Sequence, residues 1–210
     1  MTRIILGSQS PRRRELLEQI TTADQLSLLP PKTADEPGFD GLSAIPQIED
    51  QLRHIVRLKR DDVISQLPGR TIERDMCVVC ADTIVVAGDA DAPVVLGKPD
   101  GHDWQNTVRT WFRNYYSGRS HEVWTCCRLE THDQSSEPLV KTAVTMSEIS
   151  DSLIDWYLST EESQGKAGGY GIQGKAALFV DGITGSLTNV IGLPMREVVQ
   201  SLSELSVSFG

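Results

Sequence analysis

The segment Gly7-Ser8-Gln9-Ser10-Pro11-Arg12-Arg13-Arg14 decides how the start of this chain folds. It follows a short apolar, β-branched run at 3–6 and precedes a stretch, 15–20, whose apolar residues have helical spacing. This order predicts a strand, a tight loop and a helix. Ser10 is a favourable N-cap and Pro11 suits the first helical position, so the helix is expected to begin there.

The three arginines of this segment fall in the first turn of the expected helix. The backbone N–H groups of that turn already present positive charge, so three cations there are unfavourable unless an anion lies among them. A phosphate held by the loop amides, the serines and the arginines would turn this repulsion into binding energy. The alternative is a solvent-exposed basic helix start, which is common.

The composition is typical of a soluble globular protein. The 210 residues are 39% hydrophobic and 23% charged, which suits one domain, 1–210, with a substantial core. A formal net charge of −9 disfavours nucleic acids and anionic membranes as partners, because both are negative. We find no apolar run near the ~18 residues of a membrane span and no signal-peptide core, so a cytoplasmic protein is expected.

Outward from the opening segment, the hydrophobic pattern predicts further strands and helices. The expected strands are 26–29, 76–81, 83–87, 94–96, 121–130, 139–148 and 176–180. The expected helices are 46–67, 102–115, 153–158 and 194–205, with polar turns at 88–93 and 132–138 and a loop at 182–189.

Acidic and basic residues occur at unusual places in this pattern. Asp82 interrupts an otherwise apolar strand region, and a buried carboxylate there needs a charged partner or a metal. The alternative is a bulge or strand end from which the side chain reaches water. A polar loop carries the pair Asp35-Glu36, and Lys59 lies on or beside the apolar stripe of the helix that follows.

The glycine run at 165–174 and the cysteines each match a known motif only in part. The run at 165–174 contains five glycines, and Gly169, Gly171 and Gly174 match the letters of a dinucleotide-binding fingerprint. That reading is rejected because a helix and loop precede the run instead of a strand. The four cysteines lie in strand-like runs without a second pair at zinc spacing, so buried reduced thiols are expected.

Taken together, these residues favour metal-assisted hydrolysis of a nucleoside triphosphate. Carboxylates suit Mg²⁺ or Mn²⁺, which also binds substrate phosphates. Lysine and arginine supply the positive charge that a polyphosphate needs. Gln173 offers a donor and an acceptor, as recognition of a nucleobase edge requires.

Eight blocks of this chain, in order, resemble the Maf family of nucleoside triphosphate pyrophosphatases. The blocks are 8–17, Asp35-Glu36, Lys59, 81–83, 96–99, Ser117-Gly118 with His121, 166–174 and 185–194. The resemblance implies an α/β fold with a mixed, elongated sheet, flanking helices and two lobes around a central cleft. It also implies a divalent cation, often a homodimer, and cleavage between the α and β phosphates to give a nucleoside monophosphate and pyrophosphate.

The resemblance also implies roles for nine residues. Asp82 matches the family's proton acceptor, and Arg12, Thr83 and Gln173 match positions tied to substrate choice. The remaining polar lining corresponds to Ser8, Arg13, Glu36, Lys59 and Lys98. We expect Asp82, Glu36, Lys59 and Lys98 to be catalytic, and Asp82 with Glu36 to bind the Mg²⁺ or Mn²⁺. Our hypothesis for Asp82 is that it orients a metal-activated water and accepts its proton.

The glycine-rich block resembles the branch of the family that acts on dTTP and UTP. We therefore expect hydrolysis of dTTP and UTP, and of modified pyrimidine triphosphates. The first alternative is the branch that acts on 7-methyl-GTP. The second is a non-catalytic, nucleotide-binding regulator of cell division, which would not need the acidic residues.

Overall fold

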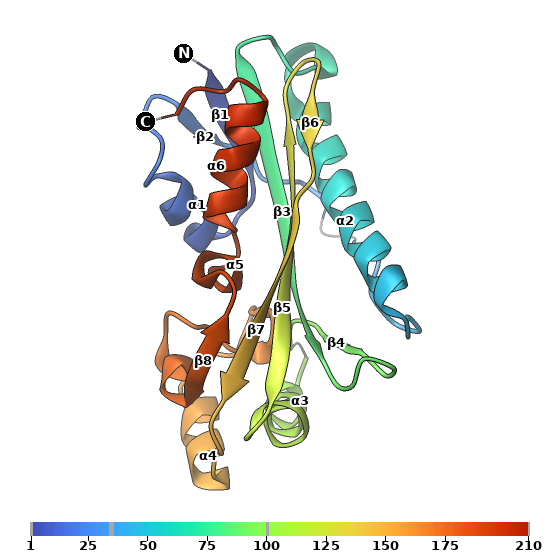
Figure 1. Ribbon diagram of the computed structural model, residues 1–210, viewed down its shortest axis with the longest axis vertical. Coiled ribbons are helices and arrows are strands. Elements are labelled where there is room, and N and C mark those ends of the chain that lie inside the picture. The colour runs from blue at the N-terminus through green and yellow to red at the C-terminus, as the bar shows by residue number, and fades with distance from the viewer. Residues whose placement is uncertain (1, 34–35, 100, 210) are drawn as a thin grey trace.

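The computed structural model describes residues 2–33, 36–99 and 101–209. Within these residues the strands form one mixed eight-stranded sheet, whose main path has the order β2-β1-β3-β5-β7-β8 (Figure 1). The strands of this path are β2 (Leu26–Leu28), β1 (Arg3–Gly7), β3 (Met76–Ala87), β5 (Ser120–Glu130), β7 (Leu139–Met146) and β8 (Val180–Thr184). β4 (Val94–Leu96) pairs with β3 and β6 (Ser135–Ser136) pairs with β5. β1 runs parallel to β2 and β3, and the other pairs are antiparallel.

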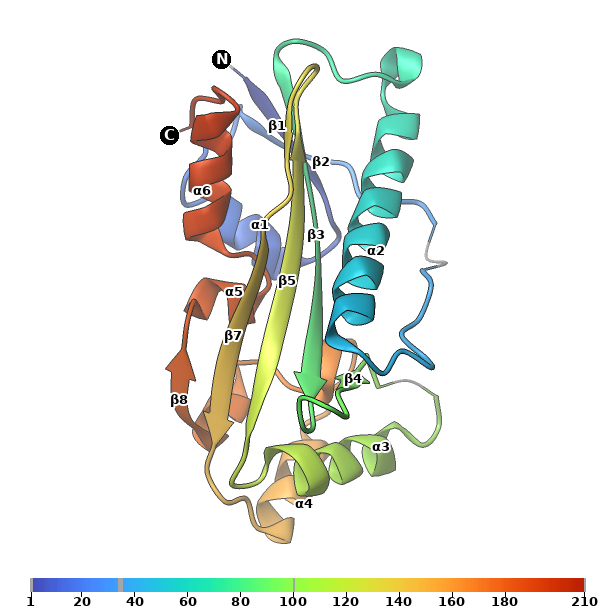
Figure 2. The same ribbon diagram turned by 45° about the vertical axis from the view of Figure 1, so that its right-hand side comes forward.

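Helices flank both faces of this sheet, which confirms the mixed α/β class. The helices are α1 (Pro11–Leu17), α2 (Ile45–Gln66), α3 (Trp104–Trp111), α4 (Asp151–Ser159), α5 (Leu187–Ile191) and α6 (Met195–Glu204). Shorter turns are η1 (Pro68–Arg70), the π-helical η2 (Phe112–Tyr116), η3 (Ala167–Gly169) and η4 (Lys175–Phe179). α1 and α6 lie on one side of the sheet and α2 on the other (Figure 2). Among the described residues, each helix is too short or too polar to cross a bilayer.

The opening segment folds as its sequence predicts. β1 ends at Gly7, and Ser10 caps α1 by accepting a hydrogen bond from the backbone N–H of Arg13. Pro11 occupies the first turn, where the missing N–H leaves no helical bond unmade. The helix ends at Leu17 and is therefore shorter than the apolar spacing through residue 20 indicated.

Alternating side chains of β3 build two hydrophobic clusters on opposite faces of the sheet. Cys77, Val79 and Ala81 pack with α1 and α6, whereas Val78 and Cys80 pack with α2. Successive strand residues point to opposite faces, so this alternation continues through the polar residues of the same strand. All four cysteines are buried free thiols, as expected, and burial raises the pKa of Cys77, Cys80 and Cys126 to about 12.

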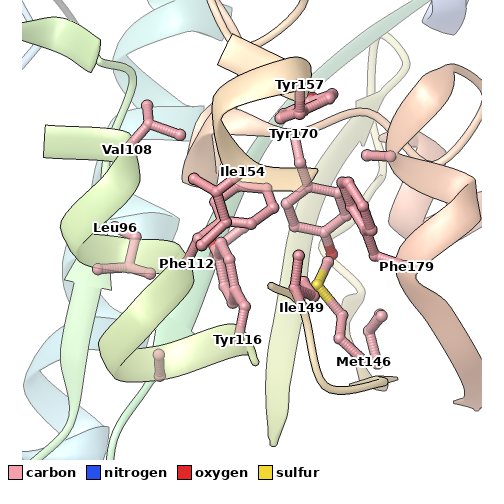
Figure 3. Close-up of a cluster of buried hydrophobic side chains, with 14 of the residues drawn as sticks. Leu96, Val108, Phe112, Tyr116, Met146, Ile149, Ile154, Tyr157, Tyr170 and Phe179 are labelled. Carbon is pink, nitrogen blue, oxygen red and sulfur yellow. The ribbon is translucent and has the colours of Figure 1, made fainter. Parts of the chain in front are cut away.

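A third cluster fills the other end of the molecule, where α3 and α4 pack against the sheet (Figure 3). Phe112 lies at its centre, with ring centroids 5.2 Å from Tyr116, 5.4 Å from Tyr157 and 5.8 Å from Phe179. β3 and β5 pass from the first two clusters into this one. The chain therefore has two packed halves joined by the same two long strands.

The position of the site follows from the way β3 is paired. On one edge, β1 pairs with β3 as far as Cys80, and β4 pairs with it only from Val85 onward. Between these points the described residues provide no strand on that edge, whereas β5 pairs continuously along the other. Asp82 and Thr83 lie in this gap, within a continuous strand and not at a strand end.

The sequence reading fails at two places near the C-terminus. The expected strand 176–180 is the 3-10 helix η4, in which Ala176 and Phe179 are buried and Leu178 is 64% exposed. The expected loop 182–189 contains the end of β8 and the start of α5. β8 is held by backbone pairing to β7 and buries few side chains, so its sequence lacks a strand pattern. The polar turn at 132–138 likewise includes the two residues of β6.

Candidate active site

A cavity of about 790 Å³ opens where the two halves meet at the gap beside β3. One side comes from the loop after β1, the first turn of α1 and α2, and the other from the segment after β4 and the glycine-rich loop. All nine residues singled out from the sequence line it, namely Ser8, Arg12, Arg13, Glu36, Lys59, Asp82, Thr83, Lys98 and Gln173. Asp35, the other member of the expected acidic pair, lies outside the described residues.

Lys59 joins the two acidic side chains of the site. Its Nζ lies 2.5 Å from Asp82 Oδ1 and 3.1 Å from Glu36 Oε1. The Lys59 and Asp82 side chains are only 11% and 13% exposed, whereas Glu36 is 36% exposed. Asp82 belongs to the set of β3 side chains that faces α2, and Lys59 projects from α2 toward it. The carboxylate in the buried strand is therefore paired, as the physics of burial requires.

The donor set fits a divalent cation that is completed by substrate oxygens. Among the described residues no group of three or more histidine, cysteine or acidic side chains could hold a metal by itself. Mg²⁺, however, is often bound by one or two carboxylates together with phosphate oxygens and water. Asp82 and Glu36 supply two carboxylates on one wall of the cavity, and each uses one oxygen to bind Lys59.

Arg13 is held by three neutral oxygens on the face of β3 opposite to that of Asp82 and Lys59. Its guanidinium donates to the Gly192 carbonyl at 2.8 Å, to Thr83 Oγ1 at 3.0 Å and to Ser8 Oγ at 3.3 Å. Because Thr83 follows Asp82 directly, it points to the opposite face of the sheet. The two neighbouring residues thus hold Lys59 on one face and Arg13 on the other.

A buried polar network supports Thr83 from behind. Its hydroxyl lies 2.9 Å from that of Thr125, which donates to the Asn189 carbonyl at 3.2 Å. The Asn189 side chain in turn donates to Val123 O and to Thr142 Oγ1, each at 2.9 Å. Sequence reasoning missed Thr125 and Asn189. Only the register of β5 against β3, which pairs Thr83 with Thr125, could have indicated Thr125, and Asn189 joins the network through the contacts of α5 with β5.

Positive charge exceeds negative charge in this cavity. Among the described residues that line it, the cationic side chains are Arg12, Arg13, Lys32, Lys59, Lys98 and Lys166, and the carboxylates are Glu36, Asp82 and Glu162. Burial lowers the pKa of Arg12, the nearby charge of Arg13 lowers it further, and Glu15 partly opposes this. The cavity is thus cationic in a protein whose net charge is −9.

The glycine-rich loop forms one wall of the cavity, and its glycines allow it to pack closely against the third cluster. A Cβ atom at Gly168 would lie 2.6 Å from the Tyr116 hydroxyl, and one at Gly169 would lie 2.9 Å from Val108. Gly168 also donates its N–H to the Gly97 carbonyl at 2.9 Å, which places the loop beside Lys98. The glycine spacing therefore serves packing against the third cluster, and the rejection of a dinucleotide fingerprint is consistent with the η3 and η4 turns found here.

Glu162 and Lys166 are the functional candidates that the sequence did not single out. Both line the cavity, and the Glu162 carboxylate accepts the backbone N–H of Lys175 at 2.8 Å and that of Ala176 at 3.4 Å. These bonds cap the start of η4, which explains why an apolar run expected to be a strand begins as a helix. The contact joins segments 13 residues apart and leaves no local sequence signal.

Comparisons with known proteins agree with this geometry. The family model described as Maf-like protein matches residues 3–205. A relative named dTTP/UTP pyrophosphatase from Bacillus velezensis is 34% identical over 206 residues, which cover 98% of this chain and 97% of the relative. Relatives of the same name from Anaeromyxobacter dehalogenans and Pyrococcus furiosus are 37% and 35% identical, and the matches cover 95% of this chain and 92% and 94% of those proteins.

The match to the family model extends from the first strand to the end of α6, and so takes in every element that lines the cavity. The likeness to the three relatives is equally complete, and it is well above the level at which only a fold is shared. On both grounds, this chain belongs to the family of Maf-like proteins.

Proposed function

We propose that this protein hydrolyses dTTP and UTP to the nucleoside monophosphate and pyrophosphate, with the help of Mg²⁺ or Mn²⁺. The observation that carries the proposal is the excess of cationic side chains around a lysine-linked pair of carboxylates in one cavity. A triphosphate supplies the negative charge that such a cavity lacks. The names of the relatives support the choice of dTTP and UTP.

In the proposed reaction, Asp82 orients the attacking water and accepts its proton. Lys59 fixes the position of the Asp82 carboxylate through their contact at 2.5 Å, and Glu36 in turn holds Lys59 through a contact at 3.1 Å. Asp82 and Glu36 would hold the divalent cation, which lowers the pKa of bound water and neutralises phosphate charge. Proton transfer to a well-placed carboxylate contributes about 10²- to 10⁴-fold to a rate.

In the proposed reaction, the cationic side chains stabilise the leaving group. Cleavage between the α and β phosphates develops negative charge on the departing pyrophosphate, which lysines and arginines stabilise. Arg13 is already held in place by Ser8, Thr83 and Gly192, so its orientation needs little rearrangement when substrate binds. Lys98 is exposed at the cavity and is free to reach the phosphates.

Gln173 is the proposed contact to the nucleobase. It lines the cavity from the glycine-rich loop, whereas Asp82 comes from β3 and Glu36 from the loop before α2. An amide can donate to and accept from the edge of uracil or thymine at the same time. Within this proposal, Gln173 sets the preference for dTTP and UTP over 7-methyl-GTP, and Arg12 and Thr83 support that choice by holding the rest of the nucleotide so that its base reaches Gln173.

A substrate panel and one variant test the proposal. We expect the wild-type protein with Mg²⁺ or Mn²⁺ to release pyrophosphate from dTTP and UTP faster than from 7-methyl-GTP or the other canonical triphosphates. Asp82→Asn is expected to lower turnover by at least about 10²-fold, because the proton acceptor is lost, while nucleotide affinity changes only a few-fold.

The matched control is Asp75→Asn, which removes an exposed carboxylate one residue before β3. Its turnover is expected to equal that of the wild type. Near-normal turnover of Asp82→Asn would contradict the assigned role. Binding of nucleotides without any release of pyrophosphate from the wild-type protein would favour the non-catalytic regulator instead.

A further inference from the structure

The glycine-rich loop makes room for two charged side chains, Lys166 and Glu162. A Cβ atom at Gly171 would lie 2.9 Å from Lys166 Cε, and one at Gly174 would lie 2.5 Å from Glu162 Cδ. Real Cβ atoms do not approach other atoms so closely, so both positions require glycine while these side chains stay in place. The loop is thus in direct contact with Lys166, whose side chain packs against Gly171.

Lys166 brings into the cavity a positive charge that the nearby Glu162 carboxylate compensates only partly. Its Nζ donates a hydrogen bond to the backbone carbonyl of Glu162, a neutral acceptor. Within the part of the chain that the structure describes, neither Lys166 nor Arg12 forms an ion pair, whereas Lys59 has two. The ammonium of Lys166 is half-buried at the cavity wall, where an unpaired charge is unfavourable.

Arg12 and Lys166 line the same cavity although they come from opposite ends of the chain. Burial lowers the pKa of Lys166, the Glu162 carboxylate raises it, and the charges of Arg12 and, outside the cavity, Lys175 lower it again. Burial and a neighbouring arginine lower the pKa of Arg12 as well. Two repelling cations that share a cavity gain most from an anion that binds both.

We propose that Lys166 and Arg12 together bind the phosphate chain of the substrate, as a second cationic pair separate from the Lys59 cluster. The inference rests on the proposed function, which supplies the triphosphate, and adds Lys166 to the binding residues. Glu162 is a positioning residue in this arrangement, because it receives the Lys166 ammonium on its carbonyl and caps η4 with its carboxylate. Lys166 therefore contributes to affinity more than to the chemical step.

The test compares Lys166→Met with Lys175→Met, which removes an exposed lysine that does not line the cavity. We expect Lys166→Met to raise KM for dTTP and UTP by about ten- to a hundredfold, the usual effect of losing a charge-assisted hydrogen bond. Its affinity for inorganic tripolyphosphate, measured by calorimetry, is expected to fall by the same factor. Lys175→Met is expected to stay within about twofold of the wild type in both measurements.

A second measurement uses the wild-type protein and does not depend on how the variant folds. Reductive methylation of lysines, read by mass spectrometry, is expected to slow at Lys166 when tripolyphosphate is added and to continue at Lys175. A Lys166→Met protein with wild-type KM and tripolyphosphate affinity, or equal labelling of Lys166 with and without tripolyphosphate, would overturn the inference. Equal losses in both variants would also overturn it, since only a long-range charge effect would remain.

The outcomes separate this inference from the proposed function. If the wild-type protein hydrolyses dTTP and UTP and Lys166→Met behaves normally, the proposed function stands and the second cationic pair does not. If the wild-type protein hydrolyses no triphosphate and yet Lys166 is needed for tripolyphosphate binding, the pair stands and the hydrolysis does not.

Discussion

At the scale of single residues, the centre of the site is a lysine that holds two carboxylates at fixed positions. Lys59 lies 2.5 Å from Asp82 and 3.1 Å from Glu36, and its own side chain is 11% exposed. Lysine is suited to this place because a compact ammonium can contact two carboxylate groups at once. The ammonium also reduces the repulsion between the two acids.

Lys59→Met is expected to lower kcat by about ten- to a hundredfold, because Asp82 loses the contact that orients it. The measurement is steady-state turnover of UTP, with circular dichroism to confirm folding. Lys141→Met is the matched control, since Lys141 also binds a carboxylate, Glu49 at 2.6 Å, but lies outside the cavity. Equal kcat values for Lys59→Met and the wild type would contradict the proposed arrangement.

Gly7 shows how closely the strands pack beneath the same site. A Cβ atom at Gly7 would lie 2.5 Å from Cys80 Sγ and 2.8 Å from Val63 Cγ2, and both of these side chains are fully buried. Gly7→Ala is therefore expected to lower the free energy of unfolding by about 1–3 kcal/mol, as overpacking of a core does. Urea denaturation measures this loss.

Two further variants check the cause of the Gly7→Ala effect. Gly182→Ala is the control, because no atom lies within 4 Å of the added Cβ there, and its stability is expected to be unchanged. Adding Cys80→Ala to Gly7→Ala removes the nearest clash, so the double variant is expected to lose less than the sum of the two single variants. Strict additivity would mean that the contact is not responsible.

At the scale of elements, α2 anchors the loop that leads to the acidic residues. The Asp62 carboxylate accepts hydrogen bonds from the backbone N–H of Lys32 at 2.9 Å and of Thr33 at 3.1 Å, from the Thr33 hydroxyl and from Gln66 at 2.7 Å. Burial alone would raise the pKa of Asp62, but these hydrogen bonds outweigh it and lower the pKa to about 2 from an ordinary value of 3.8. Asp62, which anchors the loop in this way, lies about one helical turn beyond Lys59 on α2.

This low pKa gives the anchor a defined pH dependence. A carboxylate with a lower pKa in the folded state stabilises that state above its unfolded pKa, and the contribution disappears as pH falls from about 3.8 to about 2. Amide hydrogen exchange at Lys32 and Thr33 is therefore expected to be slower in the wild type than in Asp62→Asn at pH 5 to 7, by about severalfold. The difference is expected to shrink once the pH falls below about 4.

Asp61→Asn is the control for this experiment, because the neighbouring Asp61 pairs with Arg60 and, unlike Asp62, forms no hydrogen bond with the described loop residues Lys32 and Thr33. Its exchange rates at Lys32 and Thr33 are expected to match those of the wild type. If Asp62→Asn exchanges at the wild-type rate, the hydrogen bonds of Asp62 do not hold the loop.

The sequence predicts elements well where a local pattern sets them. The strand, cap and helix at 3–17 and the long helix α2 follow from apolar spacing, Ser10 and flanking prolines. It fails at η4 and β8, where the deciding contacts are the Glu162 carboxylate and backbone pairing with β7. Both contacts come from distant parts of the chain, so no local pattern records them.

The same distinction applies to the candidate site. Asp82 stands out because a carboxylate inside an apolar strand demands a partner, and Arg12 and Arg13 stand out because cations crowd a helix start. Thr125 and Asn189 do not stand out, because a threonine in a strand and an asparagine in a helix are ordinary. The role of Thr125 arises from the register between β3 and β5, and that of Asn189 from the contacts of α5 with β5.

At the scale of the whole molecule, a protein of net charge −9 maintains a cationic cavity at its centre. The surrounding negative surface repels anions, and the local excess of lysine and arginine attracts them at one place. Substrate affinity is therefore expected to depend strongly on salt.

Raising NaCl from about 50 mM to about 500 mM is expected to increase KM for UTP severalfold, because the screening length shortens below the size of the cavity. The value of kcat is expected to change less than about twofold, since charges on a substrate held inside the cavity are screened less than charges in open solution. Initial rates across a salt series measure both. Lys166→Met should show a shallower slope, and a KM independent of salt would argue against electrostatic capture.

The two long strands have a consequence for motion in this molecule. β3 and β5 run through both halves, and Asp82 lies midway along β3, paired with Cys126 of β5. Any hinge bending of one half against the other must twist these strands about that midpoint. The Asp82 carboxylate and Lys59, which is bound to it, would then stay nearly stationary at the pivot, while the glycine-rich loop that carries Lys166 travels toward or away from a bound phosphate.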